Sequence, residues 1–392
     1  MAILAINAGS SSLKFAVYAL QGAAVGAALV RGNIEGLEPG GTPELKWRVD
    51  AQETCSALPA GSEAPFERAL RSLRELLDSL PAMPALRIIA HRVVHGGSAY
   101  TTSVLVDDEV LAALTQLNAL APLHQPHNLA GIVAFRDAFP QIPQVACFDT
   151  AYHATLPVVE SSLALPPTLT TQGLRRYGFH GLSYQYIMGA LQAHSAQAAG
   201  RVLMAHLGNG ASLCAARDGR SCATTMSFST LDGLMMGTRC GALDPGVLLY
   251  LLEQGWNHQR LQTLLYKQSG LLGVSGVSAD MRRLRADGGE AARRAIELFT
   301  HRLVREAGAL IACLQGLDVL AFSGGIGEHD GSLRAALCAA LSWLGVVIDP
   351  ALNRAAVGDA VCTIHAPGSR VEVWVVPTDE GRVAAAEAAR FV

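Results

Sequence analysis

Two short segments of the chain, 200 residues apart, repeat one pattern that constrains the fold more than any other feature. Residues 3–13 read ILAINAGSSSL, and residues 203–213 read LMAHLGNGASL. Each segment is an apolar run, a turn of small residues and a Ser-Leu pair that opens a second extended run. Strand–turn–strand hairpins are common, so a chance match is one interpretation. We favour the other interpretation, two related domains that each open with such a hairpin, because the offset is about half of the chain.

Short apolar runs alternate with longer segments of helical spacing along the rest of the sequence. This alternation predicts an α/β fold, and a length of 392 residues favours two domains over one. The expected strands lie at 3–6, 87–94, 145–148, 202–206, 319–322 and 371–376. The clearest expected helices lie at 66–80, 107–120, 129–139, 245–266, 289–317 and 381–391.

Composition and charge argue against several classes of protein. Hydrophobic residues make up 50% of the chain and charged residues 16%, so the chain can bury a large core. The formal net charge of -3 gives no strong attraction to nucleic acid or to an anionic membrane, and we expect neither as a partner. The eight cysteines form no CxxC and indicate buried thiols of a reducing compartment, not disulfides or a zinc site. Without a signal-peptide pattern or a membrane-length apolar run, we expect a soluble, cytoplasmic protein.

Three turns of small residues follow expected strands, and their backbone N–H groups and hydroxyls can contact phosphate oxygens. The first, Asn7–Lys14, combines an amide, three hydroxyls and one cation. The second, His206–Gly210, contains the Asn-Gly pair of a tight hairpin, and a purely structural turn stays open for both. The third, Ser323–Glu328, carries glycines that let a backbone approach a flat ligand closely, with a plain loop as the alternative. The chain has neither a P-loop nor a GxGxxG motif after a strand, so a nucleotide would bind in another way.

Two arginines and one histidine stand in unusual surroundings. Arg92 lies in the largely apolar strand end HRVVHGG, and Arg239 lies in GLMMGTRCG, a loop with almost no other charge. An arginine in apolar surroundings needs a partner. That partner is either a structural carboxylate or a bound carboxylate or phosphoryl group, for which the planar guanidinium is suited. A lone histidine is usually structural, but His180 stands among aromatic residues, glycines and two cations in RRYGFHG, which indicates an anion-binding pocket.

Two acidic residues follow expected strands. Asp149 ends the strand in CFDT, and Glu380 follows the last strand in PTDEG. An acid at the carboxyl end of a strand is well placed to hold magnesium in an α/β cleft. Either residue can instead cap the helix that follows, and for Glu380 this alternative is about as good as the metal role.

Taken together, the motifs closely resemble the acetate kinase family, within the superfamily of acetate and sugar kinases, heat-shock chaperones and actin. The shared motifs are NAGSSSLK, HRVVHGG, APLH, FDTAYH, RRYGFHG, HLGNG, LDGLMMGTRCG, GGIGE and PTDE, in the family's order and near its spacing. They run along essentially the whole chain. Any one of them is a weak signal, but the set is highly specific.

The resemblance implies a fold and an activity. The fold would be a duplicated pair of ribonuclease-H-like, actin-like ATPase domains around a hinged cleft. Residues 1–149 would form the N-terminal domain and residues 150–380 the nucleotide-binding domain, with the helix at 381–392 packing back on the first. The activity would be reversible transfer of the ATP γ-phosphoryl group to acetate, giving acetyl phosphate and ADP. Magnesium, or manganese in its place, would be the metal, ATP or ADP the co-substrate, and a homodimer the assembly.

The resemblance also implies roles for individual residues. The arginines would hold the carboxylate and the moving phosphoryl group, the histidine would donate to a phosphoryl oxygen, and an amide would touch the same group. The catalytic set implied in this way is Arg92, Arg239, His180, Asn7 and Asp149, and the metal would be held by Asn7, Asp149 and Glu380. The substrate pocket would be lined by Val94, Leu123, Phe179 and Thr230 beside Arg92. The nucleotide would be held by Lys14, Ser10, Ser12, His206, Gly208, Asn209, Gly210, Asp280, Met281, Arg282, Gly325, Ile326 and Gly327.

The chain departs from the family pattern at several positions. Thr230 stands where a proline usually lines the methyl pocket, so the preferred acid is open. Tyr184 replaces a common histidine after FHG, Leu182 a threonine, Gln125 an asparagine after APLH, and His329 an asparagine after GIGE. On the sequence alone, none of these touches the predicted phosphoryl-transfer set.

Three rival functions stay open. A propionate or mixed short-chain acid kinase is the nearest, because one methylene changes binding in a pocket by only about 1–3 kcal/mol. An ATP-driven chaperone or filament protein would use the same scaffold. A sensor that binds a nucleotide without turnover is the third.

Overall fold

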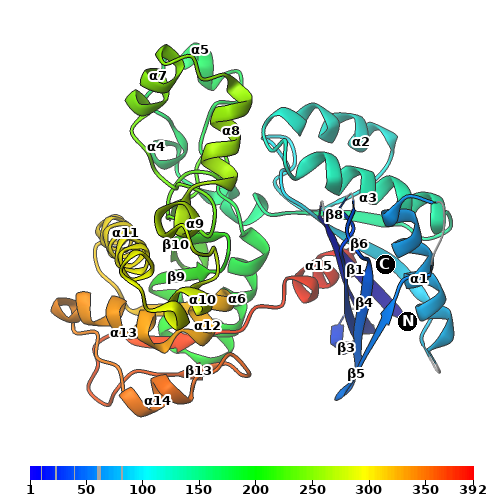
Figure 1. Ribbon diagram of the computed structural model, residues 1–392. Coiled ribbons are helices and arrows are strands. Elements are labelled where there is room, and N and C mark those ends of the chain that lie inside the picture. Colours follow the sequence, from blue (N-terminus) through cyan, green and yellow to red (C-terminus); the bar gives the residue numbers. More distant parts are fainter. Residues whose placement is uncertain (10, 23, 39, 60–62, 81–82) are drawn as a thin grey trace. The chain divides into compact units, whose positions relative to one another are not determined.

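The computed structural model describes residues 1–9, 11–22, 24–38, 40–59, 63–80 and 83–392, and these residues divide into two compact units (Figure 1). Unit 1 comprises residues 1–151 and 379–392, and unit 2 comprises residues 152–378. Each unit is a sheet covered by helices, which confirms the predicted α/β class. Glu380, which the sequence places in the second domain, belongs to unit 1 in this division.

Unit 1 is built on a sheet with the strand order β5-β4-β3-β2-β1-β6-β8-β7. The strand β1 (Ala2–Ala8) pairs antiparallel with β2 (Ser12–Gln21), which confirms the first predicted hairpin. It also pairs in parallel with β6 (Leu86–Val93), and β6 pairs in parallel with β8 (Gln144–Phe148). The carboxyl ends of these parallel strands therefore meet at one edge of the sheet. The remaining strands are β3 (Ala24–Glu35), β4 (Glu44–Val49), β5 (Gln52–Ala57) and β7 (Val104–Leu105).

The helix α1 (Pro65–Ser79) covers one face of this sheet. Leu73 and Leu77 recur at helical spacing and are buried. They pack in one hydrophobic cluster with Leu4 and Ile6, which point to the same side of β1 because side chains alternate along a strand. The period of apolar residues in the sequence thus decides which face of helix and strand is buried.

The helix α15 (Glu380–Ala388) contacts β1 and β6 on the other side of the sheet (Figure 1). Cys147 of β8 lies on that side as well, and its thiol donates to the carbonyl of Ala384 at 3.7 Å. Asp149 follows Cys147 by two residues, so strand alternation directs its side chain to the same side. The other helices of unit 1 are α2 (Asp108–Thr115) and α3 (Gln125–Ala138), with the 3₁₀ segments η1 (Gln116–Ala119) and η5 (Ala389–Phe391).

Unit 2 repeats this arrangement with the strand order β11-β10-β9-β12-β14-β13. The strand β9 (Arg201–Leu207) pairs antiparallel with β10 (Ala211–Arg217), the second predicted hairpin. It pairs in parallel with β12 (Val319–Ser323), which pairs in parallel with β14 (Glu372–Val375). Both units therefore contain the hairpin that the internal sequence similarity predicts, and the structure adds two parallel strands beside it in each unit. The remaining strands are β11 (Arg220–Thr224) and β13 (Cys362–Thr363).

The long helix α11 (Glu290–Leu314) packs against β9 and β10. Its buried residues Phe299, Leu303 and Leu310 form the apolar stripe of an amphipathic helix. No helix within the described ranges is both long and apolar enough to cross a membrane. The other helices of unit 2 are α4 (Val158–Ser161), α5 (Pro167–Thr170), α6 (Gly181–His194), α7 (Pro245–Glu253), α8 (His258–Lys267), α9 (Gly270–Ser275), α10 (Met281–Asp287), α12 (Gly324–His329), α13 (Gly331–Ala340) and α14 (Pro350–Ala355), and the 3₁₀ segments are η2 (Ala151–Thr155), η3 (Ala196–Ala199) and η4 (Ser342–Leu344).

The structure corrects the sequence expectations at two places. The single helix expected at 245–266 is two helices, α7 and α8, because Gly255 takes the left-handed φ of 82° and Asn257 then caps α8 by accepting a hydrogen bond from the Arg260 N–H. The glycine-rich segment Ser323–Glu328, for which we considered a ligand-binding turn or a plain loop, is mostly the short helix α12.

Three histidines are buried as neutral rings. His91 Nε2 lies 2.7 Å from the Gln144 amide oxygen, and His153 bridges Ser221 Oγ at 2.8 Å and the Phe179 carbonyl at 2.9 Å. Burial lowers the pKa of His91 to about 4, and it lowers the pKa values of His95 and His153 to about 4 as well.

His91→Gln should flatten the pH dependence of stability. The folded ring stays neutral between its lowered pKa of about 4 and the ordinary value of 6.5, whereas the unfolded ring takes up a proton in that range. The stabilisation is therefore complete above pH 6.5 and is lost as the pH falls towards 4, by up to about 3 kcal/mol for one group. Denaturant unfolding at about pH 7 and about pH 4.5 should show a loss that is smaller in the variant by roughly 2 kcal/mol. Equal losses in the two proteins would contradict this expectation.

Candidate active site

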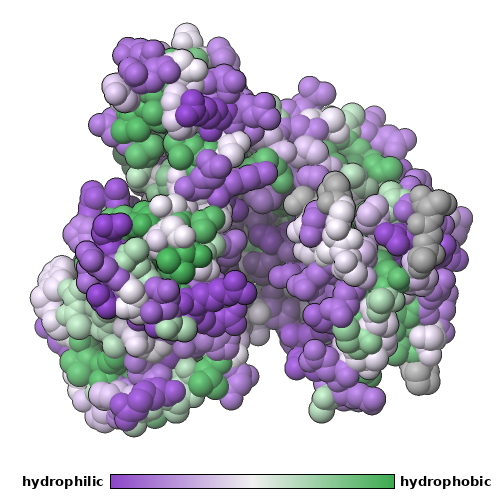
Figure 2. Space-filling view, in the orientation of Figure 1, coloured by the Kyte–Doolittle hydropathy of each residue, from purple (hydrophilic) through white to green (hydrophobic). Residues whose placement is uncertain are grey.

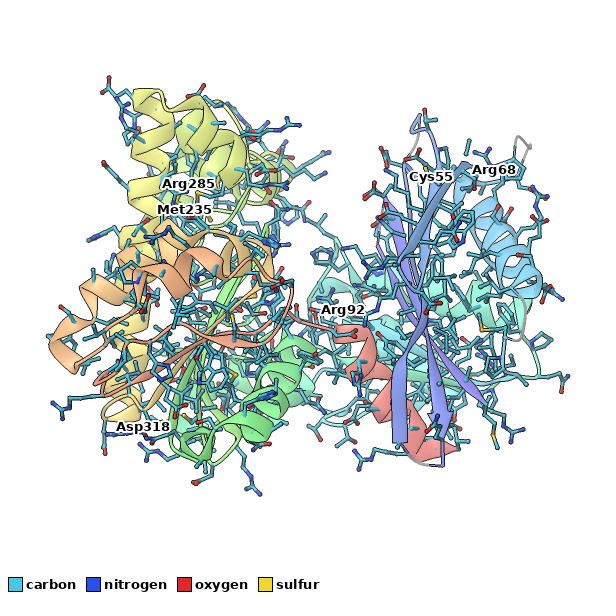
Figure 3. The ribbon with its side chains drawn as sticks, turned by 90° about the horizontal axis from the view of Figure 1, so that it is seen from below. Cys55, Arg68, Arg92, Met235, Arg285 and Asp318 are labelled. Carbon is cyan, nitrogen blue, oxygen red and sulfur yellow. The ribbon has the colours of Figure 1, made fainter. Side chains whose placement is uncertain are left out.

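Arg92 lies at the end of β6 and makes a two-pronged ion pair. Its Nε donates to Asp149 Oδ1 at 2.9 Å and its Nη2 donates to Asp149 Oδ2 at 2.7 Å, while Nη1 lies 3.3 Å from Glu380 Oε2. The Asp149 side chain is 2% exposed, whereas those of Arg92 and Glu380 are 25% and 23% exposed. Figure 3 shows Arg92 beside the first turn of α15. The structural carboxylate that we left open as a partner for Arg92 is therefore present, and the guanidinium still reaches the surface of unit 1.

The charges of Arg92, Asp149 and Glu380 shift one another's pKa values. Burial raises the pKa of the Asp149 carboxyl, and the Arg92 guanidinium opposes that shift. Burial also works against the charged form of Arg92, but attraction to Asp149 and Glu380 outweighs it and raises the Arg92 pKa. The guanidinium is consequently held in its charged form between two acids, with the geometry of a charge-assisted bidentate pair.

Asp149 and Glu380 are two of the three residues predicted to hold magnesium, and the third is Asn7 of β1. The described residues contain no group of three or more His, Cys, Asp or Glu side chains that would surround an ion. Magnesium is usually bound through one or two carboxylates, and water and substrate phosphates complete its coordination. Two carboxylates that share one arginine fit this type of site, and they do not fit an all-protein cage.

Two buried amides hold the strand ends of unit 1 in place. The Asn128 side chain donates to the Ala8 carbonyl at 2.7 Å and accepts from the Val94 N–H at 3.0 Å, which ties the end of β1 to the end of β6. Gln125 accepts from the His95 N–H at 3.2 Å and donates to the His95 carbonyl at 3.0 Å. Sequence reasoning missed Asn128 and noted Gln125 only as a departure from the family, because a buried amide looks like an exposed one in the sequence.

The remaining predicted residues of unit 1 lie on the β1–β2 hairpin, directly after β6 or shortly before α3. Asn7 and Lys14 are directly opposite in the β1–β2 register, and the Gly9 N–H donates to the Ser12 carbonyl at 2.8 Å to close the turn. Val94 is buried and Leu123 is half-buried. Ser10 lies outside the described residues.

In unit 2, the turn after β9 brings His180 and Arg239 together. A Cβ added at Gly210 would lie 3.3 Å from His180 Nε2 and 3.7 Å from Arg239 Nη1, so both nitrogens face this glycine. Arg239 Nη1 also donates to the Thr230 carbonyl at 3.1 Å. The His206 ring lies 4.6 Å from the His180 ring, centroid to centroid. The structure therefore brings two of the predicted catalytic residues, His180 and Arg239, to one glycine of unit 2.

The position of His180 is set by an unusual backbone conformation. Its φ of 59° is left-handed, which is uncommon for a residue other than glycine, and it immediately precedes α6. Gly178, two residues earlier, has a φ of 77°, and an added Cβ there would lie 2.6 Å from the His153 ring. The same His153 ring is hydrogen-bonded to the carbonyl of Phe179, whose side chain is buried. His153 thus supports the loop that presents His180, a role that sequence reasoning missed although FDTAYH contains it.

A cavity of about 710 Å³ lies in unit 2 between the turn after β9, α10 and α12. Asp280 at its edge caps α10 by accepting from the Arg282 N–H at 2.8 Å. The Arg282 guanidinium pairs with the same carboxylate at 2.7 Å and lowers the Asp280 pKa to about 2. Of the residues predicted to hold the nucleotide, those that line the cavity are Gly208, Asn209, Asp280, Met281, Arg282, Gly325 and Ile326, whereas His206, Gly210 and Gly327 do not line it.

Two of the residues that depart from the family pattern, Thr230 and Tyr184, are linked by hydrogen bonds to the predicted phosphoryl-transfer residues. Thr230 accepts from Arg239 through its carbonyl, and the Tyr184 hydroxyl bonds to Ser212 Oγ, which in turn bonds to His180 Nδ1. His329 also lines the 710 Å³ cavity. The expectation that these departures stand apart from the chemistry was therefore wrong, because contacts through a backbone carbonyl or a second side chain leave no sequence signal.

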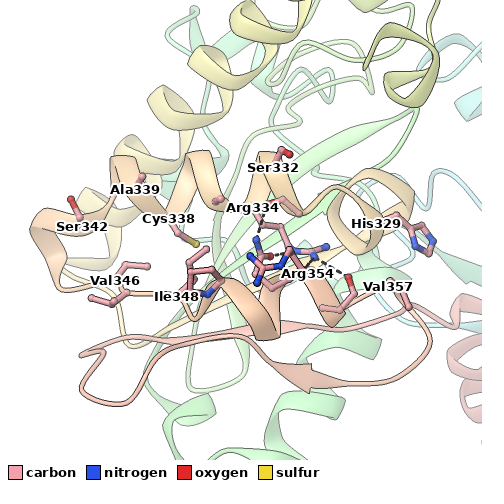
Figure 4. A pocket seen from close by; sticks show the side chains of 16 residues that line it. His329, Ser332, Arg334, Cys338, Ala339, Ser342, Val346, Ile348, Arg354 and Val357 are labelled. Carbon is pink, nitrogen blue, oxygen red and sulfur yellow. Dashed lines mark hydrogen bonds between the residues drawn. The ribbon is translucent and has the colours of Figure 1, made fainter. Parts of the chain in front are cut away.

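Arg334 on α13 supports α12, which lines the 710 Å³ cavity. It is 1% exposed and makes five hydrogen bonds, one for each guanidinium N–H group (Figure 4). Four of the acceptors are the carbonyls of Gly327, Glu328, Asn353 and Ala356, at the ends of α12 and α14, and the fifth is the Asn353 side chain. A cation is favourable at such helix carboxyl ends, and burial lowers its pKa. Arg334 also lines a second cavity of about 740 Å³ that shares His329, Gly331 and Ser332 with the first.

Arg334→Met should destabilise unit 2 and loosen the 710 Å³ cavity, which the sequence predicts to hold the nucleotide. The change leaves five buried acceptors without their donor, so we expect a loss of about 3 kcal/mol or more in the free energy of unfolding and a higher KM for ATP. Arg354→Met is the control, because Arg354 lines the same second cavity but is exposed. Denaturant unfolding and nucleotide titration measure both effects. A variant as stable as the control would show that these hydrogen bonds do not hold α12 and α14.

Comparison with known proteins shows the family and the fold of the chain. A family model described as the acetokinase family matches residues 2–386. The chain is 48% identical over 384 residues to an acetate kinase of Rhodopseudomonas palustris, covering 96% of this chain and 95% of that protein. It is 45% identical over 395 residues to an acetate kinase of Methylocella silvestris, again covering 96% and 95%. Among solved structures it is similar to a propionate kinase from Francisella tularensis (TM-score 0.91, 34% identity, all of both chains) and to Porphyromonas gingivalis acetate kinase (TM-score 0.88, 34% identity, 99% of both chains).

Proposed function

We propose that this chain, which belongs to the acetokinase family, transfers the γ-phosphoryl group of ATP reversibly to the carboxylate of acetate, giving acetyl phosphate and ADP. The observation that carries the proposal lies within unit 2. The turn that lines the nucleotide cavity with Gly208 and Asn209 continues into Gly210, where His180 Nε2 and Arg239 Nη1 converge. Donors for a phosphoryl group therefore stand one residue beyond the nucleotide cavity.

The chemistry requires charge stabilisation and no general base. A carboxylate is already ionised at neutral pH, so the obstacle is the approach of two anions and the charge of a loose transition state. His180 and Arg239 would stabilise the moving phosphoryl group, and Arg92 would hold the acid carboxylate. Asn7 would contact the phosphoryl group, with Ser12 and Lys14 of the same hairpin beside it, as the family resemblance implies.

Magnesium belongs to the proposal as the metal of the nucleotide. Asp149 and Glu380, with the Asn7 amide, would hold it, and the bound ion would neutralise charge on the phosphate oxygens. Asp149 would at the same time keep the Arg92 guanidinium in place through their bidentate pair. Manganese would serve through the same oxygen donors.

Arg239→Ala should abolish transfer and leave the fold intact. Loss of an arginine that stabilises phosphoryl-transfer charge typically lowers kcat by roughly 10³–10⁵. ATP consumption that depends on added acid, with the acyl phosphate trapped by hydroxylamine, measures the activity. Arg294→Ala is the control, because Arg294 is exposed on α11. Near-normal turnover in Arg239→Ala would remove this arginine from the mechanism. ATP hydrolysis at a rate that does not depend on added acid would instead indicate a chaperone-like or filament ATPase. ATP binding without any turnover would indicate a sensor.

Acetate is the proposed acid substrate, and the alternative is propionate or a mixture of short-chain acids. Val94, Leu123, Phe179 and Thr230 would surround the methyl group, and Thr230 is buried with its carbonyl held by Arg239. We expect kcat/KM to fall from acetate to propionate to butyrate, by roughly 10–200-fold for each methylene. A higher kcat/KM for propionate than for acetate would transfer the assignment to the alternative.

A homodimer is the proposed assembly, and α7 supports it. None of the nine residues of α7 (Pro245–Glu253) is buried, although its sequence PGVLLYLLE is almost entirely apolar. Leu249 and Tyr250 are 62% and 60% exposed. Figure 2 shows apolar surface in the region of α7. An apolar patch of this kind on a helix normally marks an interface with another protein surface.

Leu249→Asp should therefore convert a dimer into monomers, because a carboxylate would be buried at the interface without a partner. Light scattering after gel filtration would measure the molar mass. Leu352→Asp is the matched control, since Leu352 is an exposed leucine of α14. A Leu249→Asp protein with the same mass as the parent would rule out α7 as the contact.

The cytoplasm is the proposed compartment. All eight cysteines are free, but the prediction that they are buried thiols was wrong for Cys55 and Cys313, which are exposed. Exposed free thiols are characteristic of proteins that work in a reducing compartment.

A further inference from the structure

Three side chains of unit 2 form a hydrogen-bonded chain that ends on His180. Ser212 Oγ lies 2.8 Å from His180 Nδ1, and the Tyr184 hydroxyl bonds to the same Ser212 oxygen. Tyr184 stands one turn after His180 on α6, and its N–H donates to the His180 carbonyl at 3.0 Å. Tyr184 and Ser212 are both 0% exposed, so these bonds do not compete with bulk water.

The protons of this chain can be ordered in two directions. Burial raises the Tyr184 pKa well above its ordinary value, so the hydroxyl keeps its single proton. Ser212 Oγ stands between the Tyr184 hydroxyl and His180 Nδ1 and is hydrogen-bonded to both. A tyrosine that donates to Ser212 Oγ leaves the serine proton for His180 Nδ1, whereas the reverse order would require the ring proton on Nδ1.

We propose that the hydroxyls of Tyr184 and Ser212 keep Nδ1 of His180 as an acceptor and so place the imidazole proton on Nε2, the nitrogen that faces Gly210 and Arg239 Nη1. This inference rests on the proposed function, in which Nε2–H donates to an oxygen of the moving phosphoryl group. With the proton on Nδ1 instead, Nε2 would present a lone pair to an anion. Tyr184 and Ser212 touch neither substrate in this scheme and act as positioning residues for His180.

Tyr184→Phe and Ser212→Ala test the inference with little change in volume. Nitrogen-15 NMR of histidine-labelled protein reports which imidazole nitrogen carries the proton, and a His180→Ala sample assigns the signal. The parent protein should show a protonated Nε2 and an unprotonated Nδ1 on His180. Both variants should shift towards a mixture of tautomers. Tyr152→Phe is the matched control, because the Tyr152 hydroxyl donates to the Gly219 carbonyl at 3.0 Å and is not part of the chain.

Kinetics supply the second readout. In both variants kcat should fall about tenfold while the KM values for ATP and the acid stay unchanged, since one oriented hydrogen bond is lost only at the phosphoryl group. On a His180→Ala background neither variant should reduce kcat further. A loss of activity that persists on that background would show a purely structural role and would overturn the inference.

The NMR result separates this inference from the proposed function. It requires no turnover, so a parent protein without acid-dependent ATP use would fail the proposed function and still report the tautomer. A proton on Nδ1 of His180 in the parent, or identical His180 signals in the parent and both variants, would overturn the assignment. Should a variant fail to fold, the parent spectrum alone still decides whether Nε2 carries the proton.

Discussion

In each unit, the parallel pairing of strands beside a hairpin determines where the polar side chains of the site can gather. β1 pairs in parallel with β6, and β9 pairs in parallel with β12, so in each unit the hairpin turn and a strand's carboxyl end share one edge of the sheet. Polar side chains that leave this edge can reach a ligand without breaking the ladder of backbone hydrogen bonds. In unit 1 this edge carries Arg92 and Asp149, and in unit 2 the turn at Gly210 meets His180 and Arg239.

Three arginines show three ways of placing a cation in an apolar setting. Arg92 is neutralised by two acids, and Arg334 gives every N–H group to an oxygen of the fold. Arg239 contacts the Thr230 carbonyl and lies beside His180 Nε2 at the turn. Burial of a charge is costly unless it is compensated, so the type of compensation separates the roles. The guanidinium of Arg334 joins helix ends through all of its N–H groups, and for Arg239 the proposed role is contact with the phosphoryl group.

Several residues that decide the site geometry are ordinary polar side chains. Asn128 joins two strand ends, Gln125 holds the His95 backbone, and His153 holds the carbonyl before His180. The sequence predicted the hairpins, the strand positions and the cationic residues, since these depend on local patterns and on motif spacing. It did not predict these supports or the hydroxyls of Tyr184 and Ser212, because a buried amide or hydroxyl has no local pattern that separates it from an exposed one.

The sequence by itself determined the α/β class, the repeated hairpin and the family, because the periodicity of apolar residues and the order of motifs are properties of the chain. Only the tertiary structure decided that Arg92 shares two acids, that His180 and Arg239 meet at Gly210, and that Arg334 binds the ends of two helices. These contacts join residues from separate elements, such as Arg92 and Asp149, which are 57 positions apart. The strength of such contacts depends on distance and burial, and both exist only after the strands have paired and the helices have packed.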